Sequence, residues 1–77
     1  MPGLTLAPVL AGTCRVLDAQ GRQVGNLKLI GGRWKFKAIG QDEQGQLIPG
    51  GGPLTHRHNL SFEHLDGAEI SARLLGN

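Results

Sequence analysis

Glycine recurs throughout this chain and limits the regular structure that it can form. Thirteen of the 77 residues are glycine, and they fall between short apolar runs instead of forming one low-complexity block. Short apolar runs separated by glycine-containing turns are typical of a protein rich in β-structure. Two segments, 18–22 and 42–46, share the pattern Asp-x-Gln-Gly-x, which suits a type I turn followed by glycine in a bulged hairpin.

The clearest hairpin surrounds Gly31 and Gly32. A two-residue turn there pairs segment 27–30 with segment 33–36, so that apolar Leu27 and Leu29 face Phe36 and Trp34. The same register places Lys28 opposite Lys35 and Asn26 opposite Lys37 on the other face. We therefore expect Trp34 and Phe36 to anchor the core and the lysines to lie together outside it.

Other strands are expected on both sides of this hairpin. Segment 13–17 predicts a first regular strand, and residues 1–12 form a loosely ordered stretch in which Pro8 confines any strand around Leu4 to Val9 to an edge. A bulge near Gly25 would bring Val24 into phase with Leu27. Segment 46–48 is expected to pair with residues 36–39, and the Pro/Gly segment 49–53 is expected to be a loop.

The C-terminal segment favours a helix from Gly67 to Leu75 over a final strand. Asp66 is a suitable N-cap, Glu69 completes a capping box, and Gly76 follows the last turn. The sequence thus predicts one α+β domain over residues 1–77, with an antiparallel meander of about four strands and a short C-terminal helix. A small all-β barrel is the alternative.

Cationic residues are concentrated in one part of the chain. The net charge is only +2, but residues 19–41 hold five cations and no acid. Like charges placed opposite each other on a hairpin destabilise it unless something neutralises them, and a nucleic-acid backbone would do so. The candidate nucleic-acid-binding residues are Lys28, Arg33, Lys35, Lys37 and Arg57. A solvated sheet face is the plainer interpretation.

Two histidines, His56 and His58, are weak candidates for a metal site. In an extended segment they would point the same way, one strand repeat apart. Two ligands are not a site, so we assign no metal and no cofactor. The plainer interpretation is a rim of neutral histidines hydrogen-bonded to backbone near the glycine loop.

No catalytic residue is predicted. The single cysteine, Cys14, lies close to Val16 and Leu17, as a small buried apolar residue would, and excludes an internal disulfide. The acids Asp42 and Glu43 sit in a predicted turn, and Gly50 to Gly52 lack the Lys-Ser or Lys-Thr of a phosphate loop. We expect no enzyme and no small-molecule substrate. With no apolar run long enough for a membrane span and no basic leader, the expected location is the cytoplasm.

The segment from Gly32 to Gln41 resembles a strand of the TerD-type tellurite-resistance stress proteins. The resemblance covers ten residues and implies a strand that buries Trp34 and Phe36. Those proteins are larger β-sandwiches with acidic calcium-binding loops, and this chain has no equivalent acidic residues. Neither a calcium site nor an activity is therefore carried over.

The competing functional hypothesis is a protein-interaction or homo-oligomeric module. A chain of 77 residues has a thin core, and without disulfides a second copy of the chain is one source of stability. Apolar residues that the predicted core leaves out could form the interface. These are Ile30, Ile39 and Ile48.

Overall fold

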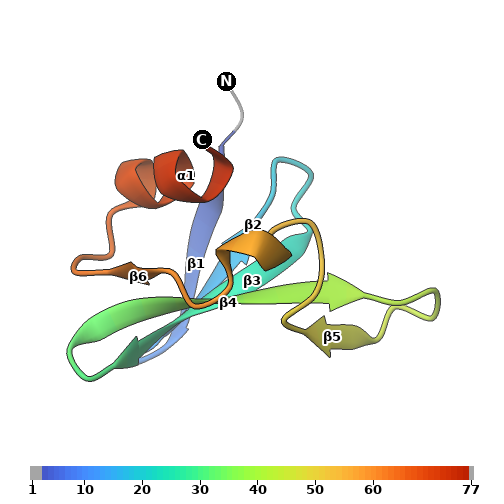
Figure 1. Ribbon diagram of the computed structural model, residues 1–77, viewed down its shortest axis with the longest axis horizontal. Coiled ribbons are helices and arrows are strands. Elements are labelled where there is room, and N and C mark those ends of the chain that lie inside the picture. Colours follow the sequence, from blue (N-terminus) through green and yellow to red (C-terminus); the bar gives the residue numbers. More distant parts are fainter. Residues whose placement is uncertain (1–2, 77) are drawn as a thin grey trace.

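Five strands follow one another across an open antiparallel sheet in chain order in the computed structural model, which describes residues 3–76 (Figure 1). They are β1 (Thr5–Leu10), β2 (Thr13–Leu17), β3 (Gln23–Ile30), β4 (Arg33–Gln41) and β5 (Leu47–Pro49). A short β6 (Ser61–Phe62) also pairs with β4, and a 3₁₀ turn η1 (Thr55–Arg57) and the helix α1 (Gly67–Leu75) complete the chain. The antiparallel meander and the C-terminal helix are confirmed. The strands outnumber the four expected, and the sheet does not close into a barrel.

The β3–β4 hairpin has the register expected from its sequence. Leu27 pairs with Phe36, Leu29 with Trp34, and Lys28 with Lys35. The turn between the strands has φ values of 58° and 80° at its two glycines, a backbone conformation that residues with a Cβ rarely adopt. Turn geometry and side-chain alternation therefore specify the same pairing.

The two Asp-x-Gln-Gly turns have the same hydrogen bonds. In the first, the Asp18 carboxylate accepts from the backbone N–H groups of Gln20 and Arg22 at 2.9 and 2.8 Å. In the second, the Asp42 carboxylate accepts from those of Gln44 and Gln46, both at 2.9 Å. Both carboxylates therefore stabilise their own turns.

The bulge expected near Gly25 is present. Val16 pairs with Gly25 and Leu17 pairs with Gln23, so Val24 is the extra residue on β3. Val24 and Gly25 are consecutive and both are buried, which a regular strand with one buried face does not allow.

β4 has two different partners along one edge. Its first residues pair with β6, Trp34 lying opposite Phe62, whereas its last residues pair with β5, Gly40 lying opposite Ile48. The segment after the second turn pairs with β4, as expected, but further along it: residues 47–49 pair with residues 39–41 instead of 36–39. Pro49, which was expected to be in the loop, belongs to β5. Residues 58–60 occupy the edge between the two partners.

The N-terminal segment contains more regular structure than expected. β1 pairs with β2 along its length, with an irregularity between Pro8 and Leu10. Pro8 lies on an edge strand, where its missing N–H removes no ladder hydrogen bond from a central strand. Residues 1 and 2 of the stretch expected to be loosely ordered lie outside the described residues.

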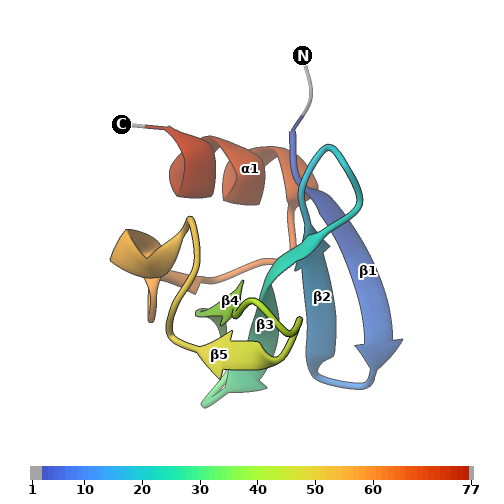
Figure 2. The ribbon, with the colours of Figure 1, turned by 90° about the vertical axis from the view of Figure 1, so that its right-hand side faces the viewer.

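Helix α1 begins as the capping pattern predicts. The Asp66 carboxylate accepts hydrogen bonds from the backbone N–H groups of Ala68 and Glu69 at 3.0 and 3.2 Å. The Glu69 carboxylate, which was expected to complete a capping box, lies 3.7 Å from Arg73 Nη1 instead. The helix lies across one face of the sheet, and η1 lies on the same side (Figures 1 and 2).

The core fills the space between α1 and the sheet. Phe36 is fully buried, as expected, whereas Trp34 is only partly buried and packs against the edge of the core. The other buried apolar side chains of this cluster come from β2, β3, β4, β6, the segment before η1, and α1. They are Cys14, Val16, Val24, Leu27, Ala38, Leu54, Phe62, Ile70 and Leu74. No helix in the described part of the chain is long and apolar enough to cross a membrane.

Candidate nucleic-acid interface

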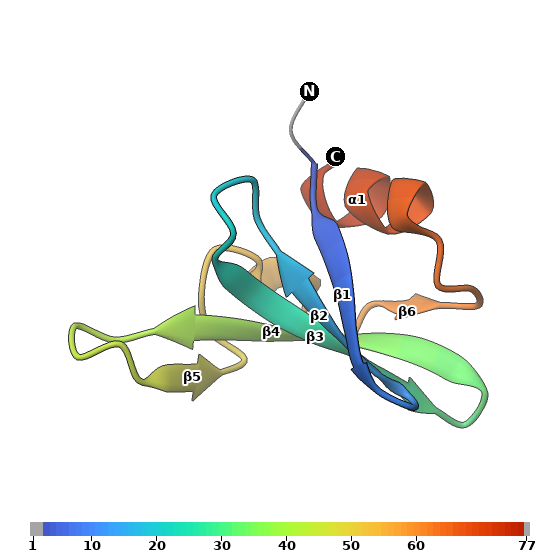
Figure 3. The same cartoon turned by 180° about the vertical axis from the view of Figure 1, so that it is seen from behind.

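Cationic side chains gather on the outer face, which we define as the side of β2, β3 and β4 turned away from α1. Cys14, Val16, Leu27 and Phe36 point into the core, so the residues that alternate with them point outward. No helix in residues 3–76 covers this side of the β3–β4 ribbons (Figures 1 and 3).

The strand register arranges these side chains in two rows across the sheet. In one row, Arg15 pairs with Asn26, which pairs with Lys37. In the next row, Lys28 lies directly opposite Lys35. Four cations from three strands therefore share one face, as expected for Lys28, Lys35 and Lys37.

Arg15 was not among the predicted site residues. The alternation in segment 13–17 could have predicted that Arg15 points outward, because it lies between the buried residues Cys14 and Val16. Only the pairing of β2 with β3, however, brings it beside Asn26. The register of the β2–β3 hairpin thus adds a fourth cation to the face.

The outer-face cations lack acidic partners in the part of the chain that the structure describes. The ion pairs found in residues 3–76 join Arg22 to Asp18, Arg33 to Glu63 and Arg73 to Glu69. Lys37 donates a hydrogen bond to the neutral Asn59 side chain, at 2.6 Å from Nζ to Oδ1. The charges of these four cations are therefore uncompensated, whereas Arg33, the first residue of β4, is paired with Glu63.

Arg57 lies away from this group. Its guanidinium donates to the backbone carbonyl of Gly76, after the last residue of α1, which covers the opposite face of the sheet. This guanidinium stabilises the end of the helix, where carbonyl groups lack helical partners. The structure therefore separates Arg57 from the other predicted site residues.

The two histidine candidates are not on an extended strand. His56 lies in η1 and is exposed, whereas the His58 ring accepts a hydrogen bond from the backbone N–H of Ala38, at 3.0 Å to Nδ1. The interpretation of a histidine bonded to backbone near the glycine loop is confirmed for His58. Among residues 3–76, no three His, Cys, Asp or Glu side chains come together in a way that could hold a metal ion.

A groove of about 410 Å³ crosses the outer face between β3 and β5. One flank carries Lys28 and Lys37, and the other carries the apolar side chains of Leu47 and Pro49. The remaining lining comes from β3, β4 and the loop after β5: Asn26, Ala38, Ile39, Gly50 and His58. The groove therefore combines positive charge with an apolar wall.

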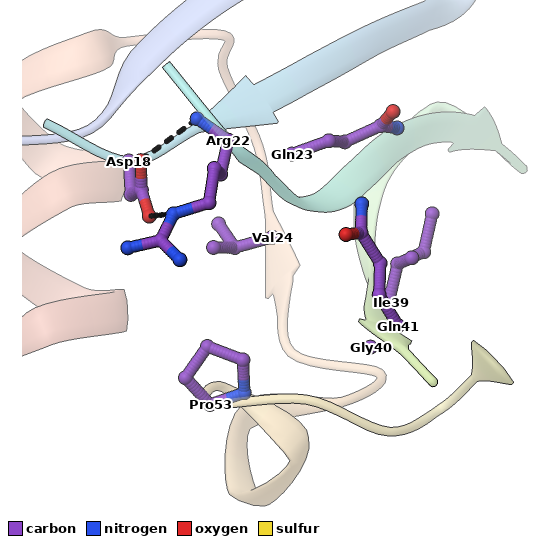
Figure 4. A pocket seen from close by; sticks show the side chains of 8 residues that line it. All are labelled: Asp18, Arg22, Gln23, Val24, Ile39, Gly40, Gln41 and Pro53. Atoms are coloured by element: carbon purple, nitrogen blue, oxygen red, sulfur yellow. Dashed lines mark hydrogen bonds and ion pairs between the residues drawn. The ribbon is translucent and has the colours of Figure 1, made fainter. Parts of the chain in front are cut away.

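A second hollow, of about 340 Å³, lies near the Asp18 turn. Figure 4 shows the Asp18 and Arg22 side chains on one side of it and Gln23 and Gln41 on the other, with Pro53 at its edge. Val24, Ile39 and Gly40 complete the lining. Because Asp18 and Arg22 bind each other and the Asp18 carboxylate also holds its own turn, this hollow offers no free charged group.

Two residues considered for catalysis, Cys14 and Asp42, are each constrained by the fold. Cys14 is fully buried, and this burial raises the pKa of its thiol, which disfavours the reactive thiolate. Asp42 is held by its turn. We find no nucleophile with an adjacent base among these residues.

Comparison with known protein families, curated proteins and solved structures finds no match for this chain. The segment that resembles a TerD-type strand forms β4, as that resemblance implies, but its Trp34 is only partly buried.

Proposed function

We propose that this protein is a non-enzymatic binding module whose outer face contacts the backbone of a nucleic acid. One observation carries the proposal: Arg15, Lys28, Lys35 and Lys37 share an open sheet face and have no carboxylate within ion-pair distance in residues 3–76. Cross-strand like charges destabilise a sheet when they stay uncompensated, so a polyanion would stabilise this arrangement.

The energetics of phosphate binding fit such a face. Each phosphate contact releases condensed counterions, and the logarithm of the affinity falls with the logarithm of the salt concentration. Four contacts predict a slope of about −2.8 for a single strand and about −3.6 for a duplex. We place this interaction in the cytoplasm, where the single thiol would stay reduced.

Titration of a labelled nucleic acid with the protein over a range of salt concentrations tests the proposal. Binding should weaken with salt, and the double variant Lys28→Ser with Lys35→Ser should reduce both the affinity and the salt slope. The control is the double variant Arg22→Ser with Arg73→Ser. It removes the same amount of positive charge, but at positions that are not on the outer face. Binding that does not depend on salt, or an equal loss in both double variants, would contradict the proposal.

A second candidate function, self-association, has one specific observation in its favour. The tips of the β1–β2 and β3–β4 hairpins are joined by a hydrogen bond from the Leu29 N–H to the Gly12 carbonyl, at 2.9 Å. Large apolar side chains are exposed around this contact: Val9, Leu10, Leu29 and Ile30. Of the residues expected to form an interface, Ile30 and Ile48 are exposed, but Ile39 is only 8% exposed and is not available.

Sedimentation analysis of the wild type and of a Leu10→Ser variant tests this candidate. Leu10 is 72% exposed, so the substitution should leave the fold intact while it weakens any association through the hairpin tips. A wild-type monomer at high concentration would rule out self-association.

A further inference from the structure

The groove on the outer face offers two kinds of contact to a single ligand, charged and apolar. Lys28 and Lys37 supply positive charge from β3 and β4, while Leu47 and Pro49 supply an apolar wall from β5. Its volume of about 410 Å³ lies within the range of small-ligand sites, roughly 300–1,000 Å³. A ligand that fills it should be anionic at one end and should present an apolar surface at the other.

Two of the polar groups around the groove are held in place by neighbours. The Lys37 ammonium is held by the Asn59 side chain at 2.6 Å. Because His58 Nδ1 accepts from the Ala38 amide, the neutral ring carries its proton on Nε2. That edge of the ring lies beside Gly50, where an added Cβ would come within 4.0 Å of Nε2. Two polar side chains that line the groove, Lys37 and His58, are thus held in fixed positions.

We infer that this groove holds one unpaired nucleotide, with its phosphate near Lys28 and Lys37 and its base against Leu47 and Pro49. The inference rests on the proposed function and adds a substrate class to it. The bases of a duplex are paired and stacked, so they cannot present a free face to the β5 wall. The outer face should therefore bind single strands more tightly than duplexes.

The β5 strand provides a matched pair of variants for the test. Leu47 lines the groove, whereas Ile48 pairs with Gly40 and points to the other face of the sheet. Both side chains are about half exposed, 54% for Leu47 and 45% for Ile48, so replacing either with serine should preserve the fold. Only the Leu47→Ser variant should change the contact with a base.

The experiment compares a labelled single strand with a duplex of the same length by fluorescence anisotropy. Leu47→Ser removes apolar surface that the base would cover, and roughly 40 Å² of such surface corresponds to about fivefold in affinity. Single-strand binding should weaken by about that factor, and duplex binding should not change. Ile48→Ser should change neither. Thymidine monophosphate should displace the single strand, and inorganic phosphate at the same concentration should not.

The outcomes separate the two proposals. If single strand and duplex bind equally, or if Leu47→Ser weakens both by the same factor, the groove does not hold a base, although the backbone-binding proposal stands. Equal displacement by inorganic phosphate would also overturn the inference. If neither nucleic acid binds with a dependence on salt, the proposed function itself fails.

Discussion

The backbone amide of Ala38 donates a hydrogen bond to Nδ1 of His58, 20 residues further along the chain. At this point β4 has lost β6 as a partner and has not yet met β5. The imidazole ring takes the place of a strand carbonyl there, and the Ala38 carbonyl accepts from the Gly50 amide at 2.7 Å. One side chain and one loop amide thus complete the sheet edge beside the groove.

Replacing His58 should therefore destabilise the fold. His58→Leu leaves the partly buried Ala38 amide without its partner, which should cost about 1–2 kcal/mol in the free energy of unfolding. His58→Asn, whose side-chain oxygen can accept in place of Nδ1, should lose less. Urea unfolding measures both, and His56→Leu is the control because His56 is exposed. Equal stability of all three variants and the wild type would contradict this role.

The Lys28–Lys35 pair should destabilise the free protein. Lys35→Glu replaces a cross-strand repulsion with an attraction and should raise the free energy of unfolding by about 0.2–1 kcal/mol. Both side chains reach solvent, so the gain should shrink as salt is added. Unfolding curves at low and high salt measure this difference. A gain that did not depend on salt would have another cause.

Gly25 should not tolerate a side chain. A Cβ at this position would meet the Phe36 ring and would lie 2.7 Å from the Lys37 carbonyl oxygen. Gly25→Ala should therefore destabilise the protein by about 2 kcal/mol or more. The matched control is Gly67→Ala at the start of α1, where the nearest atom is a Leu6 methyl at 3.9 Å. That variant should gain about 0.5–1 kcal/mol, because alanine favours a helix. Thermal or urea unfolding would show the opposite signs.

Cys14 should be unreactive and should make stability fall at high pH. Burial raises the pKa of its thiol in the folded state, so the unfolded chain loses the thiol proton at a lower pH than the folded chain does. Its contribution to stability is complete below the ordinary thiol pKa and is lost as the pH rises toward the folded value. Urea unfolding at increasing pH should show this loss in the wild type, and Cys14→Ala should lack that part of it.

A second measurement tests the burial of Cys14 without changing the pH, so other groups that titrate at high pH do not affect it. Alkylation by iodoacetamide should be slow in the native protein and fast in urea, because the folded thiol has no exposed surface. Rapid alkylation of the native protein would show that the thiol is accessible.

Local interactions account for the elements that the sequence specified correctly. The Gly31–Gly32 turn and the alternation around it determine the β3–β4 register. The cap at Asp66 determines where α1 begins. Each of these features involves residues close together in the chain, so its geometry follows from turn chemistry and periodicity alone.

Contacts between distant segments decided the remainder. Short apolar segments such as 47–49 and 61–62 fit several positions along β4, and only the packing of the whole chain selects one. The same packing places the Arg57 guanidinium against the end of α1 and the His58 ring against the Ala38 amide. The sequence alone therefore determined a hairpin with three lysines on one side. The tertiary structure decided that they share an open face with Arg15 and an apolar groove, because long-range pairing depends on which surfaces can be buried together.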